Sequence, residues 1–369
     1  MAAGVSIDGV RAQAFEIPTE KPEADGTIGW NSTVLVVVEV SGGGETGLGY
    51  TYSSVAIVDL IRGKLASAVK GLEAFNPAFA FLCMQRAIRN LGREGLAATA
   101  ISAVDTAIHD LKARLLGLPL FLMLGSYRDS VPIYGSGGFT TYSDAELQQQ
   151  LGGWVEQDGC SMVKMKIGSQ PERDAGRVKA ASQAIDGKAT LFVDANGAYR
   201  VQQALELAYE FAELQVGWFE EPVSSDDLPG LRAMRRRAPA GMEIAAGEYA
   251  YTVDYVHKML QACAVDVQQA DVTRCGGITA FLQIAALCEA FHIDLSAHCA
   301  PALHLHVACA ASRLRHLEWF HDHVRIEHML FDGAPVPVKG TIRPDRSRPG
   351  NGLTFKRQDA ARYAVAKSP

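Results

Sequence analysis

The chain has 369 residues, of which 48% are hydrophobic and 21% are charged, and its formal net charge at pH 7 is −6. This length favours a large barrel with an additional domain, and the composition is that of a globular protein with a large core. The acidic balance and the lack of a sustained basic run argue against nucleic acid as a partner.

The sequence also argues against a membrane protein. No segment is as long as the roughly eighteen apolar residues of a membrane helix, and the N-terminus (residues 1–5) lacks the charged-then-apolar order of a secretory leader. The seven cysteines are odd in number and lack the spacing of a disulfide framework. Such free cysteines fit a reducing compartment, so we expect a cytoplasmic protein. Cys275 and Cys299 are expected to be small, buried filler residues.

The N-terminal third begins with a strand pattern. Residues 32–40 are β-branched and apolar, a glycine-rich turn follows at residues 41–45, and residues 47–52 return, which predicts a hairpin. The stretch from Ile17 to Thr27 is polar and contains proline and glycine. We predict a loop there, and a loop of that length is either functional or mobile.

Helical periodicity follows between residues 55 and 124. The clearest apolar stripe runs from Ile101 to Leu115, and Gly117 and Pro119 end it. Asp105 lies away from the centre of this stripe, so we expect it to be solvated or hydrogen-bonded. Residues 1–125 are therefore predicted to be an α+β unit.

After Ser130, short apolar strands alternate with amphipathic helices at a spacing of 20 to 32 residues. A strand, a helix and two loops occupy about 25–30 residues, so this stretch predicts a (β/α)₈ barrel and an α/β fold class. The predicted strand ends are Tyr134, Lys166, Asp194, Glu220, Glu248, Asp271, His298 and Glu318.

Charged or histidine side chains stand at seven of these eight predicted ends. The carboxyl ends of parallel barrel strands share one face, where barrel active sites are built. Lys164 and Lys166 are two apart and therefore point to the same side of their strand. A pair of solvated lysines on an edge strand is the alternative, but it does not explain the other charged ends.

Asp194, Glu220 and Glu248 lie on consecutive predicted strands. Carboxylates that meet in a barrel mouth repel one another unless a cation neutralises them, and a ligand set made only of oxygen suits Mg²⁺ better than zinc. The adjacent Glu220 and Glu221 cannot both face inward, and strand alternation alone does not select one.

Lys166 and His298 come from different sides of the predicted ring. A metal flanked by two bases suits removal of a proton next to a carboxylate. We expect the charge of Lys164 to lower the pKa of Lys166 and make a neutral amine available. Asp271 would orient His298, and Glu318 would be a protonated donor to the developing oxyanion.

Taken together, these motifs resemble the enolase superfamily, and specifically its mandelate racemase-like subgroup. The matching segments are residues 104–112 with 117–120, Val163 to Gly168, Val193 to Gly197, Trp218 to Pro222, Gly247 with Glu248, Asp271 to Thr279, Ser296 to His298, and Leu317 to Trp319. The resemblance implies that Lys166 is the base and that Glu220, not Glu221, is the ligand. Asn196, in the third segment, is assigned to substrate binding.

The resemblance also implies three parts of the chain. Residues 1–125 would be a capping domain, residues 126–334 the catalytic barrel, and residues 335–369 a segment that returns to the capping domain. Residues 18–30 would form a lid over the barrel, with Asp25 and Trp30 as candidate substrate contacts; each has packing or solvation as its alternative. We further expect a homo-oligomer.

Departures from the family pattern occur around the site. Tyr249 follows Glu248 where many relatives have asparagine. His321 and His323 form an unusual cluster that either reaches a polyhydroxylated substrate or lies at the surface. His304 and His306 are expected to be structural.

Three reactions follow from a common enolate. Dehydration of an aldonate or aldarate, with His298 as the acid, gives a 2-keto-3-deoxy acid and is our choice. Racemisation or epimerisation and cycloisomerisation are the alternatives, and a non-catalytic metabolite-binding barrel is a remote one. A muconate-lactonising activity is disfavoured because Asp271 stands where that type carries lysine.

Overall fold

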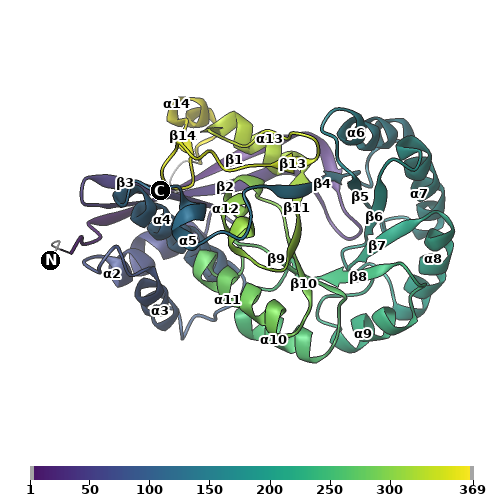
Figure 1. The fold of residues 1–369 in the computed structure, drawn as a ribbon, viewed down its shortest axis with the longest axis horizontal. Coiled ribbons are helices and arrows are strands. Elements are labelled where there is room, and N and C mark those ends of the chain that lie inside the picture. The colour runs from purple at the N-terminus through teal and green to yellow at the C-terminus, as the bar shows by residue number, and fades with distance from the viewer. Residues whose placement is uncertain (1–3, 366–369) are drawn as a thin grey trace.

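The computed structural model describes residues 4–365 (Figure 1). Residues 1–3 and 366–369 lie outside this range. The former belong to the N-terminal segment in which a secretory leader is not expected, and the latter belong to the predicted C-terminal segment. Within the described residues, none of the helices is long and apolar enough to cross a membrane.

The N-terminal part pairs an antiparallel sheet with a helical layer. The sheet has the order β1 (Gly9–Ala24), β2 (Gly29–Gly42) and β3 (Glu45–Tyr52), so the predicted hairpin is confirmed. The helices are α1 (Ile57–Leu60), a π-helical turn (Ile61–Leu65), α2 (Ala66–Val69), α3 (Pro77–Ala87), α4 (Leu96–Leu115) and α5 (Leu120–Leu124).

Helix α4 is the central support of this part. The sheet lies so close that a Cβ on Gly49 of β3 would stand 2.2 Å from the Ala103 carbonyl oxygen. Asp105 is buried and accepts hydrogen bonds from the Thr279 backbone N–H (2.9 Å) and hydroxyl (2.7 Å). Of the two expectations for Asp105, hydrogen bonding is confirmed and solvation is wrong, because α4 packs against the barrel as well as against the sheet.

Within residues 4–365, eight parallel strands close into a barrel, since β11 pairs with β4 (Figure 1). The strands are β4 (Val131–Gly137), β5 (Met162–Lys166), β6 (Thr190–Asp194), β7 (Val216–Glu220), β8 (Glu243–Ala246), β9 (Val267–Ala270), β10 (Asp294–Ala297) and β11 (Leu314–Phe320). The outer helices are α6 (Asp144–Glu156), α7 (Pro171–Ile185), α8 (Val201–Glu213), α9 (Leu228–Arg237), α10 (Val253–Gln261), α11 (Gly277–Ala290), α12 (Pro301–Ala310) and α13 (His321–Leu330).

The predicted strand ends are correct to within two residues except at β4. Lys166, Asp194 and Glu220 are the last residues of their strands, whereas Tyr134 lies in the middle of β4. Glu318 pairs with Tyr134 two residues before β11 ends. The difference arises because β4 and β11 continue to Gly137 and Phe320, and sequence periodicity does not show where backbone pairing stops.

The C-terminal part runs back along the barrel to the N-terminal sheet. Its elements are β12 (Phe331–Asp332), β13 (Thr341–Ile342), β14 (Thr354–Phe355), α14 (Arg357–Ala360) and a 3₁₀ turn (Ala361–Tyr363). The Asn351 side chain donates to the Leu48 carbonyl oxygen (2.9 Å), and its backbone N–H donates to Asp110 (2.5 Å).

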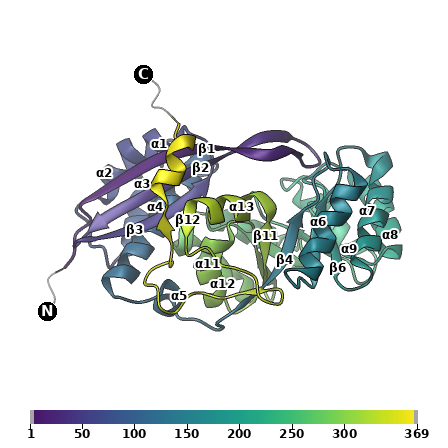
Figure 2. The ribbon, with the colours of Figure 1, turned by 90° about the horizontal axis from the view of Figure 1, so that it is seen from above.

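The distal ends of β1 and β2 form a two-stranded ribbon that reaches from the N-terminal sheet across the barrel (Figure 2). The loop predicted from Ile17 to Thr27 is therefore wrong for most of its length. Pairing is interrupted between Pro18 and Glu23 and resumes at Glu23 with Trp30. Proline and polar residues suited a loop by composition, but a solvated ribbon accepts the same residues because its edges need no further pairing.

Candidate active site

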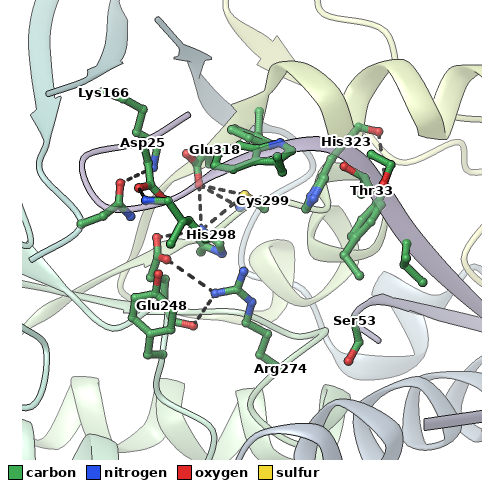
Figure 3. Close-up of a pocket in the computed structure, with 18 residues that line it drawn as sticks. Asp25, Thr33, Ser53, Lys166, Glu248, Arg274, His298, Cys299, Glu318 and His323 are labelled. Carbon is green, nitrogen blue, oxygen red and sulfur yellow. Dashed lines mark hydrogen bonds and ion pairs between the residues drawn. The ribbon is translucent and has the colours of Figure 1, made fainter. Parts of the chain in front are cut away.

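A cavity of about 400 Å³ lies between the ribbon and the carboxyl ends of the barrel strands (Figure 3). The N-terminal part lines it with Asp25, Ile28, Trp30, Ser32, Thr33, Val34, Tyr52 and Ser53. The barrel lines it with Lys166, Asn196, Glu248, Tyr249, Arg274, His298, Cys299, Glu318, Phe320 and His323. The predicted candidates Lys166, His298, Glu318, Asn196, Glu248, Asp25 and Trp30 are thus brought together at one cavity.

The predicted metal ligands form one cluster beside this cavity. Asp194, Glu220 and Glu248 each offer a carboxylate oxygen, and these oxygens lie within 4.8 Å of one another. All three side chains are buried, and burial together with Asp194 raises the pKa of Glu220 to about 8. Strand pairing fixes this arrangement, since Asp194 is directly opposite Glu220 on β6 and β7.

The neighbouring Glu221 is also buried, but it is not part of this cluster. Its backbone is in the left-handed region, with a φ of 39°, which turns the chain away at the end of β7. Its Oε1 atom has no hydrogen-bond partner among the described residues. The geometry thus selects Glu220 for the three-carboxylate cluster.

The residues present fit a hard dication. The donors are carboxylate oxygens, which Mg²⁺ prefers. The Glu248 Oε2 atom is buried without a well-directed hydrogen bond from any described residue, although it lies 3.1 Å from His298 Nε2. A buried carboxylate oxygen that lacks a donor is stabilised by a cation. Asp194, Glu220 and Glu248 would hold the ion.

Lys164 is a buried counter-charge below the cavity. Its Nζ atom lies 2.7 Å from Glu220, 2.9 Å from Glu318 and 3.5 Å from Asp194. Burial disfavours the ammonium form, but Glu220 and Glu318 outweigh it and raise the Lys164 pKa above its ordinary value. Lys164 therefore neutralises the carboxylates that converge on it.

Lys166 enters the cavity from the end of β5. Its Nζ atom lies 2.5 Å from Asp194 Oδ2 and donates to Asn196 Oδ1 at 3.1 Å. Burial favours the neutral amine, yet the Asp194 carboxylate outweighs it and raises the Lys166 pKa. The expected lowering by Lys164 is present but smaller. The neutral Lys166 that we expect stays a prediction, because a cation held by Asp194 would offset the pull of that carboxylate on the ammonium group.

His298 and Asp271 form the predicted pair. His298 Nδ1 and Asp271 Oδ2 are 2.8 Å apart, and both side chains are buried. Asp271 is fixed in turn, since its other oxygen accepts hydrogen bonds from the Thr273 backbone and hydroxyl, each at 2.7 Å. This contact directs His298 Nε2 toward Glu248 and the cavity (Figure 3).

Glu318 differs from its expected protonation state. Its carboxylate lies 2.9 Å from Lys164 and accepts a hydrogen bond from Ser136 Oγ (2.6 Å). Burial opposes ionisation, but Lys164 and then His298 outweigh it and hold the Glu318 pKa well below its usual range. The surroundings of Glu318 therefore favour its ionised form over the protonated form that we expected, because Lys164 pairs with Glu318 as well as with the metal-ligand cluster.

The ribbon residues are held mainly by one another. Asp25 Oδ1 accepts hydrogen bonds from the Thr27 backbone (2.6 Å) and the Ile28 backbone (2.8 Å), so it stabilises its own turn. Trp30 donates to Glu23 Oε2 (2.9 Å) and packs edge-on against Phe139 at a centroid distance of 5.7 Å. Both residues face the cavity, and substrate contact remains a prediction for each.

The histidines after the barrel motifs separate into different environments. His323 lines the cavity and stacks on Tyr52 at a centroid distance of 3.5 Å, whereas His321 contacts Glu20 of the ribbon at 3.2 Å. His304 and His306 bond to backbone groups in the structure. His304 Nε2 accepts from the Val272 N–H (2.8 Å), and His306 Nε2 lies 2.9 Å from the Asn351 carbonyl oxygen.

Sequence reasoning missed several cavity residues. Thr33, Ser53 and Tyr52 lie on β2, β3 or directly after them, and nothing in a hairpin pattern marks a residue that faces a different domain. Arg274 had a usable signal, since it stands three residues after Asp271, and its Nε lies 3.6 Å from the Asp271 carboxylate. Cys299 is buried as expected, but it also lines the cavity.

Comparison with known proteins agrees with this architecture. Residues 13–125 match the family described as mandelate racemase / muconate lactonizing enzyme, N-terminal domain, and residues 146–360 match the enolase C-terminal domain-like family. A crystal structure of a mandelate racemase/muconate lactonizing enzyme-like protein from Rubrobacter xylanophilus superposes with a TM-score of 0.95 at 50% identity, covering 98% of this chain and 100% of the other.

Two further relatives carry named activities. The 3,6-anhydro-alpha-L-galactonate cycloisomerase of Streptomyces coelicolor is 30% identical over 97% of this chain and 99% of its own. The L-talarate dehydratase of Polaromonas sp. JS666, crystallised with Mg and L-glucarate, superposes with a TM-score of 0.88 at 30% identity and covers 98% of both chains. The chain thus belongs to the mandelate racemase/muconate lactonizing enzyme family of the enolase superfamily.

Proposed function

We propose that this protein is a Mg²⁺-dependent acid-sugar dehydratase, which removes water from an aldonate or aldarate to give a 2-keto-3-deoxy acid. One observation carries the proposal: Lys166 and the His298–Asp271 pair meet the three-carboxylate cluster at a single cavity. Relatives that include a dehydratase crystallised with magnesium and an acid sugar support it.

The reaction needs a base at the carbon next to the substrate carboxylate. Lys166 Nζ is placed for this step, because it ends β5 beside Asp194 and faces the cavity. Bound at Asp194, Glu220 and Glu248, Mg²⁺ supplies positive charge that stabilises the negative charge developing on the substrate carboxylate. Asn196 holds Lys166 Nζ in position through its side-chain oxygen.

Departure of the β-hydroxyl needs an acid. Asp271 accepts a hydrogen bond from the Nδ1–H of His298, which leaves Nε2 facing the cavity as the site of the transferable proton. Lys166 takes the α-proton, the bond between the β-carbon and oxygen breaks, and His298 protonates the departing oxygen to give water. The enol that remains becomes the 2-keto-3-deoxy acid by proton transfer to carbon.

The remainder of the cavity wall suits a polyhydroxylated chain. Ser53, Thr33 and Tyr249 bring hydroxyl groups to it, and Arg274 and His323 bring nitrogen donors or acceptors. A substrate whose carboxylate end lies at the metal-ligand cluster would extend its hydroxyl groups along these side chains. This distribution favours an acid sugar over an apolar carboxylic acid.

Cycloisomerisation is the second candidate, favoured by the Streptomyces relative that aligns over 97% of this chain. It would begin with the same proton removal but would break or form a ring bond and release no water. Racemisation or epimerisation would return a proton to the other face of the same carbon. These reactions differ in product, so product analysis separates them.

The test is a screen of aldonates, aldarates and their anhydro forms with the Mg²⁺-loaded protein. We expect at least one acid sugar to yield a 2-keto-3-deoxy acid, detected by a carbonyl reagent and by ¹H NMR in D₂O. His298→Asn should abolish dehydration while Lys166 still exchanges the α-proton. A ring-opened isomer formed without loss of water, or dehydration at the wild-type rate in His298→Asn, would overturn the assignment.

A further inference from the structure

Cys299 is a cavity residue that the proposed reaction does not use. It follows His298 directly after β10, and its backbone is in the left-handed region with a φ of 54°. Its Sγ atom lies 3.3 Å from His298 Nε2 and 3.3 Å from Glu318 Oε2, and these nitrogen and oxygen atoms are 3.6 Å apart (Figure 3). Sulfur, imidazole nitrogen and carboxylate oxygen therefore form a compact triangle.

We propose that His298, Cys299 and Glu318 form a second metal site, selective for a thiophilic dication such as Zn²⁺ and separate from the Mg²⁺ ligands. Tetrahedral zinc with its usual bond lengths places sulfur about 3.5–3.6 Å from the nitrogen and oxygen ligands, and places those two about 3.3–3.4 Å apart. Each side of the triangle comes within about 0.3 Å of this spacing, so small side-chain rotations would complete it. The three ligand atoms lie within 4.8 Å of one another, and all three residues are buried.

Neighbouring groups already hold the three ligands in place. Asp271 contacts His298 at Nδ1, an arrangement found around zinc-bound histidines. Nε2 then lies 3.1 Å from Glu248 Oε2, and a metal on Nε2 would replace this contact. Glu318 is fixed by Lys164, by Ser136 and by the Cys299 backbone N–H, which donates to Oε2 at 3.0 Å. A site whose ligands need little rearrangement binds with a smaller entropic cost.

The two sites select different metals by donor type. The cluster of Asp194, Glu220 and Glu248 offers only oxygen and suits Mg²⁺, whereas a thiolate and an imidazole favour Zn²⁺ or Co²⁺. The cavity lies beside the triangle and offers space for water or a substrate oxygen as a fourth ligand. Metal binding releases the thiol proton of Cys299 and the Nε2 proton of His298 to solvent and changes no oxidation state.

Occupation of this second site would stop the reaction. A metal on His298 Nε2 removes the atom that delivers the proton to the departing hydroxyl. This consequence rests on the proposed function, whereas the binding of the metal does not. Zn²⁺ would therefore inhibit an enzyme that Mg²⁺ activates, and substrate that fills the cavity would compete with it.

Spectroscopy tests binding without any assumption about activity. Co²⁺ is titrated into the Mg²⁺-saturated protein, and the near-ultraviolet absorption of a thiolate–cobalt bond is recorded. We expect one equivalent of this absorption in the wild type and in Cys263→Ser, which alters an exposed cysteine, and none in Cys299→Ser. Absence of the band in the wild type, or its persistence in Cys299→Ser, would refute the site.

Inhibition is measured separately once a substrate is known. Cys299→Ser removes one direct ligand and should weaken Zn²⁺ inhibition by at least about 100-fold. Removal of a residue that only orients a ligand already weakens metal binding by about 10- to 100-fold. Calorimetry with Zn²⁺ gives the affinity for any Cys299→Ser preparation with the wild-type circular dichroism spectrum. Thiolate–cobalt absorption in a protein that turns over no acid sugar would reject the proposed function and leave the metal site standing.

Discussion

The barrel end and the β1–β2 ribbon contribute to the same cavity in different ways. Lys166, Asp194 and Glu220 end neighbouring strands, and their positions follow from continuous backbone pairing. Asp25 and Trp30 come from a ribbon whose pairing is interrupted between Pro18 and Glu23. The groups for proton transfer are therefore held by regular strand pairing. The residues that cover the cavity depend instead on how the turn between β1 and β2 packs against the barrel.

The docking of that turn rests on a close backbone contact. A Cβ on Gly26 would stand 2.4 Å from the Ala195 carbonyl oxygen and 2.5 Å from that of Ile167. These carbonyls belong to the residues directly after β6 and β5. The ribbon thus meets the barrel beside Asp194 and Lys166, so a defect in its docking should change substrate binding before it changes the proton-transfer groups.

Removal of the metal should have the largest effect, because it affects the barrel side directly. Chelation followed by desalting should lower turnover by about a thousandfold or more, since a metal supplies several kcal/mol of charge stabilisation. Added Mg²⁺ should restore turnover. Full activity in protein shown by elemental analysis to lack metal would contradict a role for the three carboxylates.

Loss of the Lys166 amine should come next. Lys166→Ala should lower turnover by about 10²–10⁴-fold, the usual contribution of a positioned acid or base. Exchange of the substrate α-proton with D₂O, followed by ¹H NMR, should fall equally for one configuration at that carbon. Lys179→Ala, on an exposed position of α7, is the matched control. Undiminished exchange in Lys166→Ala would exclude Lys166 as the base.

Gly26→Ala should displace the ribbon without altering the barrel side chains, and so should show what the ribbon contributes to the cavity. The added methyl group meets backbone oxygens that cannot rotate away, so we expect kcat/KM to fall by about 10-fold or more as substrate positioning is lost. KM should rise more than kcat falls. Gly63→Ala is the control, because its Cβ would enter open space. Wild-type kinetics in Gly26→Ala would show that the docked turn is not needed.

The smallest expected effect is a pH dependence of ribbon docking that arises from ionisation of Glu23. Burial, followed by Asp322, raises the pKa of Glu23 from 4.5 to about 8, while Trp30 and Arg325 oppose the rise. Docking is therefore favoured most below pH 4.5 and weakens as the pH rises through about 8, because the docked state resists ionisation of Glu23. Glu20, which also contributes to the pKa rise, lies on the same ribbon.

The measurement for Glu23 is Trp30 fluorescence against pH, with Trp30→Phe subtracted to remove the other tryptophans. We expect a transition near pH 8 in the wild type and a flat profile in Glu23→Gln, which keeps an acceptor for the Trp30 N–H. KM should rise across the same pH range only in the wild type. An identical transition in both proteins would assign the titration to another group.

The charges of the site residues depend on distances that the sequence does not show. Lys166 and Glu318 are placed at the cavity as expected, whereas the charges around them favour the ionised forms over the neutral forms that we expected. The sequence shows that Lys164 and Lys166 are near each other, but it does not show that Asp194 and Glu318 approach them at 2.5 and 2.9 Å. Those distances decide which charge dominates, because electrostatic energy falls steeply with separation.

The sequence by itself determined the barrel, the strand-end positions and the donor chemistry of the carboxylate cluster. Strand and helix periodicities depend on near neighbours, and the parallel topology then sends every strand end to one face. Only the tertiary structure decided that Ile17–Ala24 is ribbon and that Cys299 faces His298 and Glu318. Strand alternation left Glu220 and Glu221 open, and the geometry of the cluster agrees with the choice of Glu220 that the family resemblance implies. These features depend on contacts between distant segments, which local patterns do not encode.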